Sequence, residues 1–463
     1  MADQGRKIPL MQGKLTMLAL CVSLPLAAQA KVQEHKEKDK GPTTRVVASK
    51  KGAAANTPST SRPLPKAAAA TASVTALAAT TSVAGRGLPA TVSDSAPEAR
   101  LTRIFREIEA NRLNEALALT ENLLKQYPNY RLAHLIRGDL LLARSRPIQS
   151  FGALNNAPAD KVADLRAEAL ARLNAYREKP PGDAVPRYLL QMQPDQKHAI
   201  VVDTKRSRLY LYENDTQNGG RPRFVADYYV THGKLGTDKL IEGDKKTPIG
   251  VYHITANLPR QKLADLYGSG AFPLNYPNEL DKRQGRGGSG IWLHGTPSDT
   301  YARPPRASDG CVVLANQDLD AVAKNLQVGV TPVIISNSIE WLSLDDWNKE
   351  RGELNRSIEA WRSDWESRDV ERYLKHYSKR FRSGDKQDFD QFATQKRQVG
   401  AGKEWIKVKL DNLSVFRNPG KEEVVVVTFE QDYRSNNLDN RMKKRQYWQK
   451  EDGKWKIIYE GSA

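Results

Sequence analysis

The sequence predicts a multidomain protein with an α-helical N-terminal module, a mostly-β central domain and an α+β C-terminal domain. The chain has 463 residues, whereas a typical domain has about 150. Hydrophobic residues recur at helical spacing up to about residue 180, and near residue 198 their period changes to two, as in β-strands. A long helical pattern followed by several strand-like runs then fills the C-terminal part of the chain. These changes of period divide the chain into three folded parts.

The N-terminus has the features of a secretory signal peptide, which we predict for residues 1–30. Arg6, Lys7 and Lys14 provide positive charge before an apolar run over 15–27, and an Ala-Gln-Ala cleavage pattern follows. The apolar run is shorter than a comfortable membrane span. We therefore expect an exported protein of the periplasm or cell envelope. A signal that is not cleaved would instead act as an N-terminal membrane anchor.

A linker and a helical module follow the signal. Residues 31–97 are rich in Ala, Thr, Ser and Pro and contain no aromatic residue, so we predict a disordered low-complexity linker. The next segment, 98–182, has a helical hydrophobic pattern that Pro128 interrupts. Its paired helices resemble one tetratricopeptide-like (TPR-like) unit, but a solenoid needs about three units. We interpret this segment as a packing or dimerisation module, through which the chain would form a homodimer.

Composition restricts the class of protein and its partners. The 72 Lys and Arg residues outnumber the 54 Asp and Glu residues, which gives a formal net charge of +18, and only 39% of the chain is hydrophobic. These values exclude a polytopic membrane protein and favour anionic partners. Because export disfavours nucleic acid as the natural partner, we expect acidic cell-wall polymers. The seven histidines show no metal-ligand spacing, and no dinucleotide fingerprint occurs, so we predict no metal and no cofactor.

The two cysteines point to covalent catalysis. Cleavage of the signal peptide would remove Cys21 and leave Cys311, which cannot form an internal disulfide. His294 lies seventeen positions before Cys311, and an imidazole can take a thiol proton and later return it to a leaving amine. Gly310, directly before the cysteine, lets backbone N–H groups approach a reacting carbonyl as an oxyanion hole. The alternative role for Cys311 is that of a small buried apolar group.

These residues belong to an ordered set of motifs: Thr-Pro-Ile-Gly at 247–250, His-Gly at 294–295 and Ser-Asp-Gly-Cys-Val at 308–312. The set resembles the YkuD-type L,D-transpeptidase catalytic domain over residues 198–337. The family often has His at the position of Asp309 and Arg at the position of Val313, so this chain departs from the pattern beside the nucleophile. The resemblance implies that Cys311 attacks the diaminopimelate–D-alanine bond of a peptidoglycan tetrapeptide stem, releases D-alanine and forms a thioester.

The resemblance also implies roles for the neighbouring residues. His294 would act as general base and then as general acid, while the backbone carbonyl of Gly295 orients its ring. N–H groups near Gly310 would stabilise the oxyanion, with Ser308 as a hydrogen-bond helper. His232, which also precedes a glycine, is the alternative base.

Three charged residues close to the nucleophile are candidates to bind substrate. Arg303 and Arg306 lie on the loop before Cys311 and would bind a carboxylate of the stem peptide. Asp309 would hold a cation or the loop in place, or raise the pKa of the thiol through like-charge repulsion.

The C-terminal residues 352–463 resemble the NTF2-like cone fold, in which helices pack against a curved sheet and leave a pocket. Residues 338–357 lead into this domain as a polar connector. Tyr373, Tyr433 and Trp448 are candidates to line the pocket, and we expect the domain to bind the wall rather than to catalyse. The order of a helical segment, a YkuD-like domain and an NTF2-like domain also resembles the cell-shape LD-carboxypeptidases of curved and helical bacteria.

The acceptor of the thioester decides the reaction. We favour transfer to an amine, as in an L,D-transpeptidase, because the YkuD-like family is mainly transpeptidase. Water as acceptor would give an LD-carboxypeptidase that trims stems in cell-shape control, and a non-catalytic wall-binding scaffold is a third alternative. The presence of both His294 and Cys311 argues against the scaffold. An amine-bearing stem needs an open second groove, and we expect the loop-like segment 263–290 to shape it.

Overall fold

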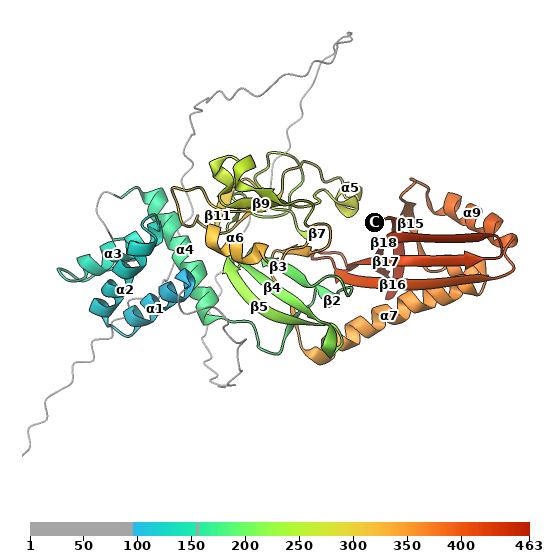
Figure 1. Cartoon of the computed structure of the whole chain (residues 1–463), viewed down its shortest axis with the longest axis horizontal. Coiled ribbons are helices and arrows are strands. Elements are labelled where there is room, and N and C mark those ends of the chain that lie inside the picture. Colours follow the sequence, from blue (N-terminus) through green and yellow to red (C-terminus); the bar gives the residue numbers. More distant parts are fainter. Residues whose placement is uncertain (1–95, 154–156) are drawn as a thin grey trace, which may run out of the picture. The chain divides into compact units, whose positions relative to one another are not determined.

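The structure, a computed structural model, describes residues 96–153 and 157–463 (Figure 1). The predicted signal peptide and linker, and with them cleavage and membrane anchoring, lie outside the described residues. Within the described ranges, no helix is both long and apolar enough to cross a membrane. A helical part, a mostly-β part and an α+β part follow one another along the chain, which confirms the predicted fold class.

The N-terminal module consists of amphipathic helices that pack on one another through their apolar faces. In the described part of this module the helices are α1 (Pro97–Glu109), α2 (Leu113–Gln126), α3 (Arg131–Leu142) and α4 (Ala159–Arg177). Leu101, Ile104, Leu123 and Leu132 form the interior, and none is more than 1% exposed. The helical module is therefore present as predicted, while its TPR-like character stays a prediction.

The side chain of Arg172 joins this module to the central domain. Arg172 of α4 is buried and forms ion pairs with Glu98 of α1 and with Glu168, the latter at 2.9 Å. Its guanidinium also lies 3.9 Å from the ring centroid of Tyr229. Glu98 continues the network to Arg208 of the central domain at 3.1 Å. Buried charges of both signs thus connect the two parts.

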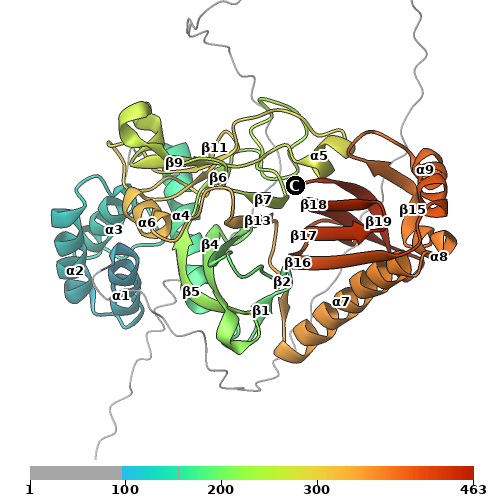
Figure 2. The same ribbon diagram turned by 45° about the vertical axis from the view of Figure 1, so that its right-hand side comes forward.

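The central domain is built on two sheets (Figure 2). Their strand orders are β5-β4-β3-β13-β7 and β12-β10-β9-β8. The first contains β3 (His198–Asp203), β4 (Arg208–Asp215), β5 (Arg221–Tyr229), β7 (Gly250–His253) and β13 (Pro332–Ser336), and the second contains β8 (Leu258–Pro259), β9 (Gly270–Pro273), β10 (Trp292–His294) and β12 (Val312–Val313). Both sheets contribute to one apolar core, in which Ile200, Leu293 and Val312 are fully buried.

Shorter elements complete the central domain. They are β6 (His232–Gly233), which pairs with β11 (Arg306–Ser308), the helices α5 (Glu279–Arg283) and α6 (Asn316–Ala323), and the short 3-10 helices η1 (Thr216–Asn218), η2 (Arg260–Lys262) and η3 (Asp265–Tyr267). The expectation that 263–290 is only a surface loop is wrong, because the segment contains β9 and α5. Its Phe272, Leu274 and Leu280 are buried. Gly and Pro residues divide its apolar positions into runs too short to show a period.

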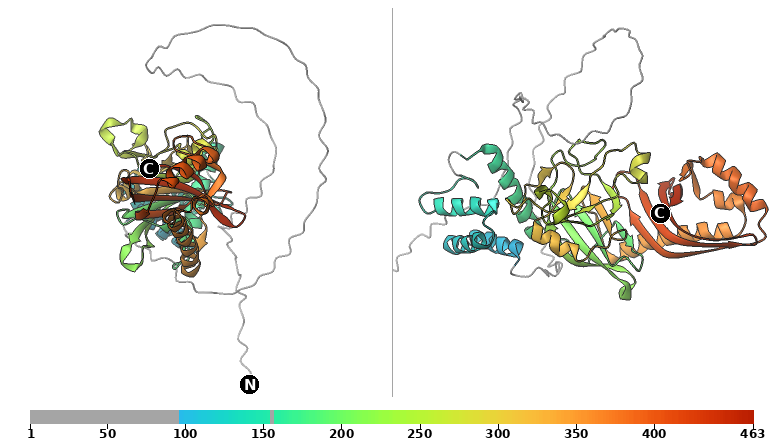
Figure 3. Two further views of the ribbon diagram at one scale, coloured as in Figure 1. Left: turned by 90° about the vertical axis from the view of Figure 1, so that its right-hand side faces the viewer. Right: turned by 45° about the horizontal axis from the view of Figure 1, so that its top comes forward.

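The C-terminal domain packs helices against a curved sheet (Figure 3). The strand order of this sheet is β15-β19-β18-β17-β16-β2. Its elements are α7 (Leu344–Glu366), α8 (Val370–Leu374), α9 (Phe389–Ala401), β15 (Tyr377–Ser383), β16 (Ile406–Arg417), β17 (Val424–Ser435), β18 (Leu438–Glu451), β19 (Lys454–Ser462) and, from before the central domain, β2 (Leu189–Gln191). Trp361 of α7 and Phe429 of β17 share the core between the layers, and both are fully buried.

The expected polar connector over 338–357 is largely helix. The segment contains β14 (Trp341–Leu342) and more than half of α7. The hydroxyl of Ser343 caps the helix by accepting the N–H of Asp346 at 3.1 Å. Trp347 and Leu354 are buried on one face of the helix, so the polar composition reflects its solvent-exposed face.

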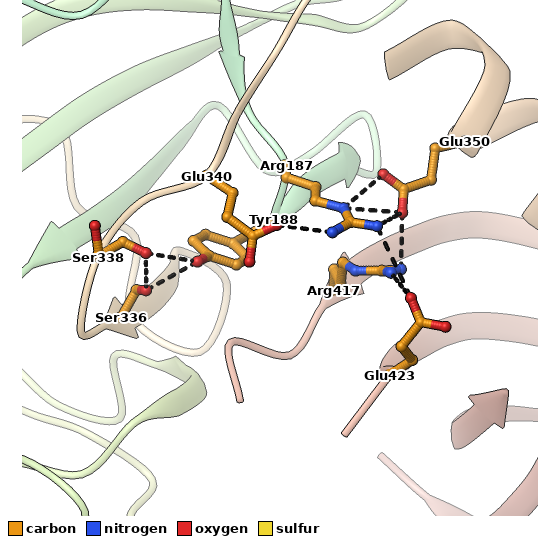
Figure 4. A network of polar contacts seen from close by, with 8 residues as sticks. All are labelled: Arg187, Tyr188, Ser336, Ser338, Glu340, Glu350, Arg417 and Glu423. Atoms are coloured by element: carbon orange, nitrogen blue, oxygen red, sulfur yellow. Dashed lines mark hydrogen bonds and ion pairs between the residues drawn. The ribbon is translucent and has the colours of Figure 1, made fainter. Parts of the chain in front are cut away.

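Two short strands before the central domain tie it to the C-terminal domain. The strands β1 (Val185–Pro186) and β2 pair with β14 and β16, respectively. Figure 4 shows the ion pairs beside them: Arg187 lies 3.0 Å from Glu350 of α7, which also pairs with Arg417 of β16 at 2.8 Å. Backbone pairing and charge pairing therefore act together at this junction.

We predict that Arg172→Ala destabilises the attachment of the helical module by about 3–5 kcal/mol, because the substitution leaves the buried carboxylate of Glu168 without a partner. Chemical denaturation followed by far-UV circular dichroism, together with limited proteolysis, would measure the loss. The matched control is Arg137→Ala, since Arg137 and Glu121 form an exposed pair at 3.2 Å that contributes about 1 kcal/mol at most. Equal losses in the two variants would contradict the prediction.

Candidate active site

Parallel pairing of β10 with β12 brings the two predicted catalytic residues together. In this pairing Leu293 lies opposite Val312, and both side chains face the core. Side chains alternate between the faces of a sheet. His294 follows Leu293 and Cys311 precedes Val312, so the imidazole and the thiol lie on the same face of adjacent strands.

The environment of His294 favours a neutral imidazole with a fixed tautomer. Its Nδ1 lies 2.7 Å from the backbone carbonyl of Gly295. A carbonyl only accepts hydrogen bonds, so Nδ1 carries the proton and Nε2 keeps a free lone pair. Tyr267 packs edge-on against the ring at a centroid distance of 5.1 Å. Burial lowers the pKa of His294 to about 4. A neutral imidazole with an available Nε2 can act as a general base.

The thiol of Cys311 is half-buried, and in the free protein it is mainly protonated. Its Sγ donates to the backbone carbonyl of Gly290 at 3.2 Å. Burial raises the pKa of the thiol, while a backbone hydrogen bond from Trp292 and the positive charges of Arg303 and Lys239 act in the opposite direction. The site therefore holds a thiol beside a neutral imidazole, and the nucleophile has to be formed during attack.

The turn before Cys311 is held by hydroxyl groups. Gly310 has φ +130°, and a Cβ there would lie 2.7 Å from the carbonyl oxygen of Lys246, so only glycine fits. The hydroxyl of Thr247 donates to the carbonyl of Gly310 at 2.9 Å. Ser308 donates its hydroxyl to the carbonyl of Cys311 at 2.6 Å and accepts the N–H of Gly310 at 3.2 Å. Ser308 thus shapes the turn, and the oxyanion role of Gly310 stays a prediction.

The three charged candidates occupy different positions around the turn. Arg303 is half-buried, and its guanidinium donates to the carbonyl of Ala307 at 2.6 Å. Arg306 is exposed on β11. Asp309 is exposed and forms an ion pair with Lys234 at 3.2 Å. The two arginines line a groove of about 690 Å³ beside the loop that precedes Cys311, which we call the nucleophile loop. Asp309 does not line this groove.

Asn316 is a positioning residue that the sequence analysis did not identify. Its Oδ1 accepts the N–H groups of Ser269 at 2.9 Å and Thr296 at 3.1 Å. A Cβ on Gly295 would lie 2.1 Å from this oxygen, which explains the glycine after the catalytic histidine. Asn316 therefore connects the loop after β10 to the loop before β9, and its position at the start of α6 was the available signal.

His232, the alternative base, belongs to a different pair of strands from His294. His232 lies on β6, which pairs with β11, so its backbone neighbour is Arg306 rather than Cys311. Burial lowers the pKa of His232 to about 4. Over the two described ranges, no three His, Cys, Asp or Glu side chains lie together as metal ligands would.

A pocket of about 210 Å³ opens in the C-terminal domain. Tyr373 and Tyr433 line it as predicted, together with Trp365 and Lys396. The expectation for Trp448 is wrong, because its side chain is fully buried and donates to Gln446 at 2.9 Å. Trp448 lies further along the face of β18 that also carries the pocket residues Met442 and Lys444, and Trp361 packs against it at a centroid distance of 6.4 Å.

Comparisons with known proteins agree with this architecture. The family model of the L,D-transpeptidase catalytic domain, YkuD, matches residues 197–335, and that of the Cds6 C-terminal NTF2-like domain matches 353–461. The structure of Bd1075 from Bdellovibrio bacteriovorus is 30% identical, with a TM-score of 0.54, covering 61% of this chain and 98% of that one. Comparison with the curated proteins gave no match.

Two further structures are of the helical cell shape determining protein Pgp2 from Campylobacter jejuni. One is 29% identical and covers 59% of this chain and 95% of that one, with a TM-score of 0.51. The other, a point variant, is 26% identical and covers 66% of this chain and 100% of that one, with a TM-score of 0.52. The resemblance predicted from the motifs is confirmed.

We predict that iodoacetamide alkylates Cys311 in the folded protein and abolishes activity, and that the rate still rises with pH above about 9. The raised pKa of the thiol means that thiolate accumulates only as pH increases through that raised value. Mass spectrometry of the labelled peptide gives the rate, and Cys311→Ala corrects for labelling of Cys21. Free cysteine is the reference compound, and its alkylation rate should level off at a lower pH than that of Cys311. A constant rate between about pH 6 and 8 would instead indicate a preformed thiolate–imidazolium pair.

Proposed function

Since the chain belongs to the family of YkuD-type L,D-transpeptidase domain proteins with a C-terminal NTF2-like domain, we propose that it opens the diaminopimelate–D-alanine bond of peptidoglycan stems. The observation that carries the proposal is the pairing of β10 with β12, which lays the thiol of Cys311 and the imidazole of His294 on one face. Cys311 is also the only cysteine among the described residues.

The first step forms a thioester and releases D-alanine. Nε2 of His294 takes the thiol proton while Sγ of Cys311 attacks the carbonyl carbon of diaminopimelate. Backbone N–H groups at the Gly310 turn stabilise the negative charge on the carbonyl oxygen. The C–N bond then breaks as His294 returns the proton to the amine of D-alanine. The bond to Gly295 keeps the ring in position through both transfers.

The second step transfers the acyl group to an amine of another stem, which makes the protein an L,D-transpeptidase. Such an acceptor needs room beside the thioester, and the groove lined by Arg303 and Arg306 provides about 690 Å³ of space on that side. His294, again neutral, takes a proton from the attacking amine. The thiol leaves with that proton.

Hydrolysis is the second candidate, and one observation favours it. The chain covers 95–100% of the structures of a protein described as determining helical cell shape, and this layout resembles cell-shape LD-carboxypeptidases. In this reaction water replaces the amine, and stems are shortened rather than crosslinked. Either reaction takes place on the cell wall, so the predicted signal peptide and a periplasmic or envelope location agree with both.

We predict that the protein converts tetrapeptide muropeptides into dimers linked between diaminopimelate residues, and that His294→Ala lowers kcat by about 10²–10⁴-fold. Mass analysis of the products measures both. His232→Ala is the matched control and keeps activity, since His232 lies on β6. Tripeptide monomers and free D-alanine as sole products at high substrate concentration would establish the carboxypeptidase. No turnover by the wild type would favour the scaffold.

We further propose that the C-terminal pocket binds the wall. Trp365, Tyr373 and Tyr433 offer aromatic faces, and the ammonium of Lys396 lies 5.8 Å from the ring centroid of Trp365. Burial lowers the pKa of Lys396. Aromatic faces with a desolvated cation suit a sugar ring that carries an acidic substituent.

Replacing the cation tests this role without removing the domain, whose sheet also includes β2. We predict that Lys396→Gln weakens binding to purified sacculi by about fivefold, because the pocket loses its buried charge. A pull-down with quantified free protein measures the affinity. Lys421→Gln, an exposed substitution between β16 and β17, leaves it unchanged. Equal binding by both variants would show that the pocket is not used.

A further inference from the structure

A groove lies where the helical module meets the nucleophile loop. Its volume is about 690 Å³, and residues of both parts form its walls. Its charged residues are Arg131, Lys161 and Asp164 on α3 and α4, and Lys234, Asp299, Arg303 and Arg306 in the central domain. The helical module is therefore more than an attachment, because it forms one side of a cavity that opens next to the catalytic turn.

Contacts at the rim hold the helical module in place. The ring of Tyr301 lies 4.3 Å from that of Tyr130, and the N–H of Tyr301 donates to the carbonyl of Asn129 at 3.3 Å. Asn129 also donates its side-chain amide to the carbonyl of Ser298 at 3.1 Å. These contacts fix the turn between α2 and α3 on the loop that leads to Arg303. The wall that carries Lys161 consequently has a defined position.

The groove carries an excess of positive charge. Five cationic side chains and two carboxylates line it. Asp299 is paired with Arg131 at 3.3 Å, and Lys234 is paired with Asp309 at 3.2 Å. Among the ion pairs of the described residues, none includes Arg303 or Arg306. A half-buried guanidinium without a carboxylate partner is a strong binding site for an anion, because the anion offsets the hydration that burial removes.

Neither Cys311 nor His294 lines the groove, and Arg303 is its electrostatic link to both groups. The charge of Arg303 lowers the pKa of both Cys311 and His294, so the guanidinium lies within electrostatic range of the thiol and the imidazole. Lys161 lies on the opposite wall, on α4. Cations therefore extend from the catalytic turn to the helical module.

We propose that the helical module and the nucleophile loop together form a substrate groove, in which Lys161, Arg303 and Arg306 bind the free carboxylates of a peptidoglycan stem peptide. This inference rests on the proposed function and assigns the helical module to substrate binding. A diaminopimelate-containing stem is an extended chain with several free carboxylates, which suits cations on two facing walls. The module thus selects anionic peptides over neutral ones.

Lys161→Glu tests the groove on its helical side. Lys161 is exposed, and its nearest carboxylate is Asp160 at 3.6 Å, so the substitution leaves the packed contacts intact. Calorimetry on the full chain with Cys311→Ala measures binding without turnover. We expect Kd for a tetrapeptide muropeptide to rise about fivefold, and about tenfold or more with Arg306→Glu added. Lys125→Glu, on an exposed part of α2 outside the groove, is the matched control and changes nothing.

Ligand chemistry separates the outcomes. A tetrapeptide with amidated carboxyl groups is expected to bind weakly to both parent and variants. A tripeptide stem lacks the terminal D-alanine and cannot be an acyl donor. We expect Lys161→Glu, alone or with Arg306→Glu, to bind this tripeptide more weakly than the parent protein does. If Lys161→Glu and Lys125→Glu bind the unamidated tetrapeptide with equal affinity, the inference is overturned, even if the wild type is active as an enzyme. The wild type could show no turnover while Lys161→Glu still weakens binding to the Cys311→Ala protein. That result would overturn the proposed reaction but support the substrate groove.

Discussion

The parallel pairing of β10 with β12 is the constraint on which the active site depends. Leu293 and Val312 lie opposite each other in the apolar core, and this burial fixes the register, because a shift by one residue would turn one strand over relative to the other. Correct register is what brings His294 and Cys311 to the same face. Hydrogen bonds in the neighbouring loops support this arrangement. The hydroxyl of Thr247 donates to the carbonyl of Gly310, and Oδ1 of Asn316 accepts the N–H of Thr296. Packing thus determines where the chemistry occurs, and hydrogen bonds determine its orientation.

The two accessory parts are attached to this centre by different physical means. The C-terminal domain shares backbone with the central one, since β2 adds a strand beside β16, and Arg187 with Glu350 reinforces the joint (Figure 4). The helical module relies on buried charge around Arg172. Asp318 lies close to this network, and burial raises its pKa to about 7. Buried ion pairs contribute little net stability but are specific in geometry, which suits a contact that must position a wall of the groove.

Local sequence patterns predicted the three folded parts, the mostly-β character of the central domain and the candidate pair His294 and Cys311, because each depends on short-range periodicity or on residue chemistry. Local patterns gave no prediction or a wrong one where contacts between distant parts of the chain determine the structure. Residues 189–191 join a sheet whose other strands lie nearly two hundred residues later or more, and no local signal encodes that. The exposed face of α7 concealed its beginning at Leu344. Trp448 was assigned to the pocket because aromatic character alone does not say which side chains a helix covers, and Trp361 of α7 packs against Trp448.

The protonation states of the free site bear on how it would respond to substrate. Burial keeps Cys311 as a thiol and His294 as a neutral imidazole, so charge separates only when attack begins. Arg303 disfavours the imidazolium that attack creates. A carboxylate bound to Arg303 would offset that positive charge, and this would raise the basicity of His294 at the moment when a stem occupies the groove. The same carboxylate would also remove a positive charge that lowers the pKa of Cys311, so occupation of the groove acts on the base and on the thiol through one guanidinium.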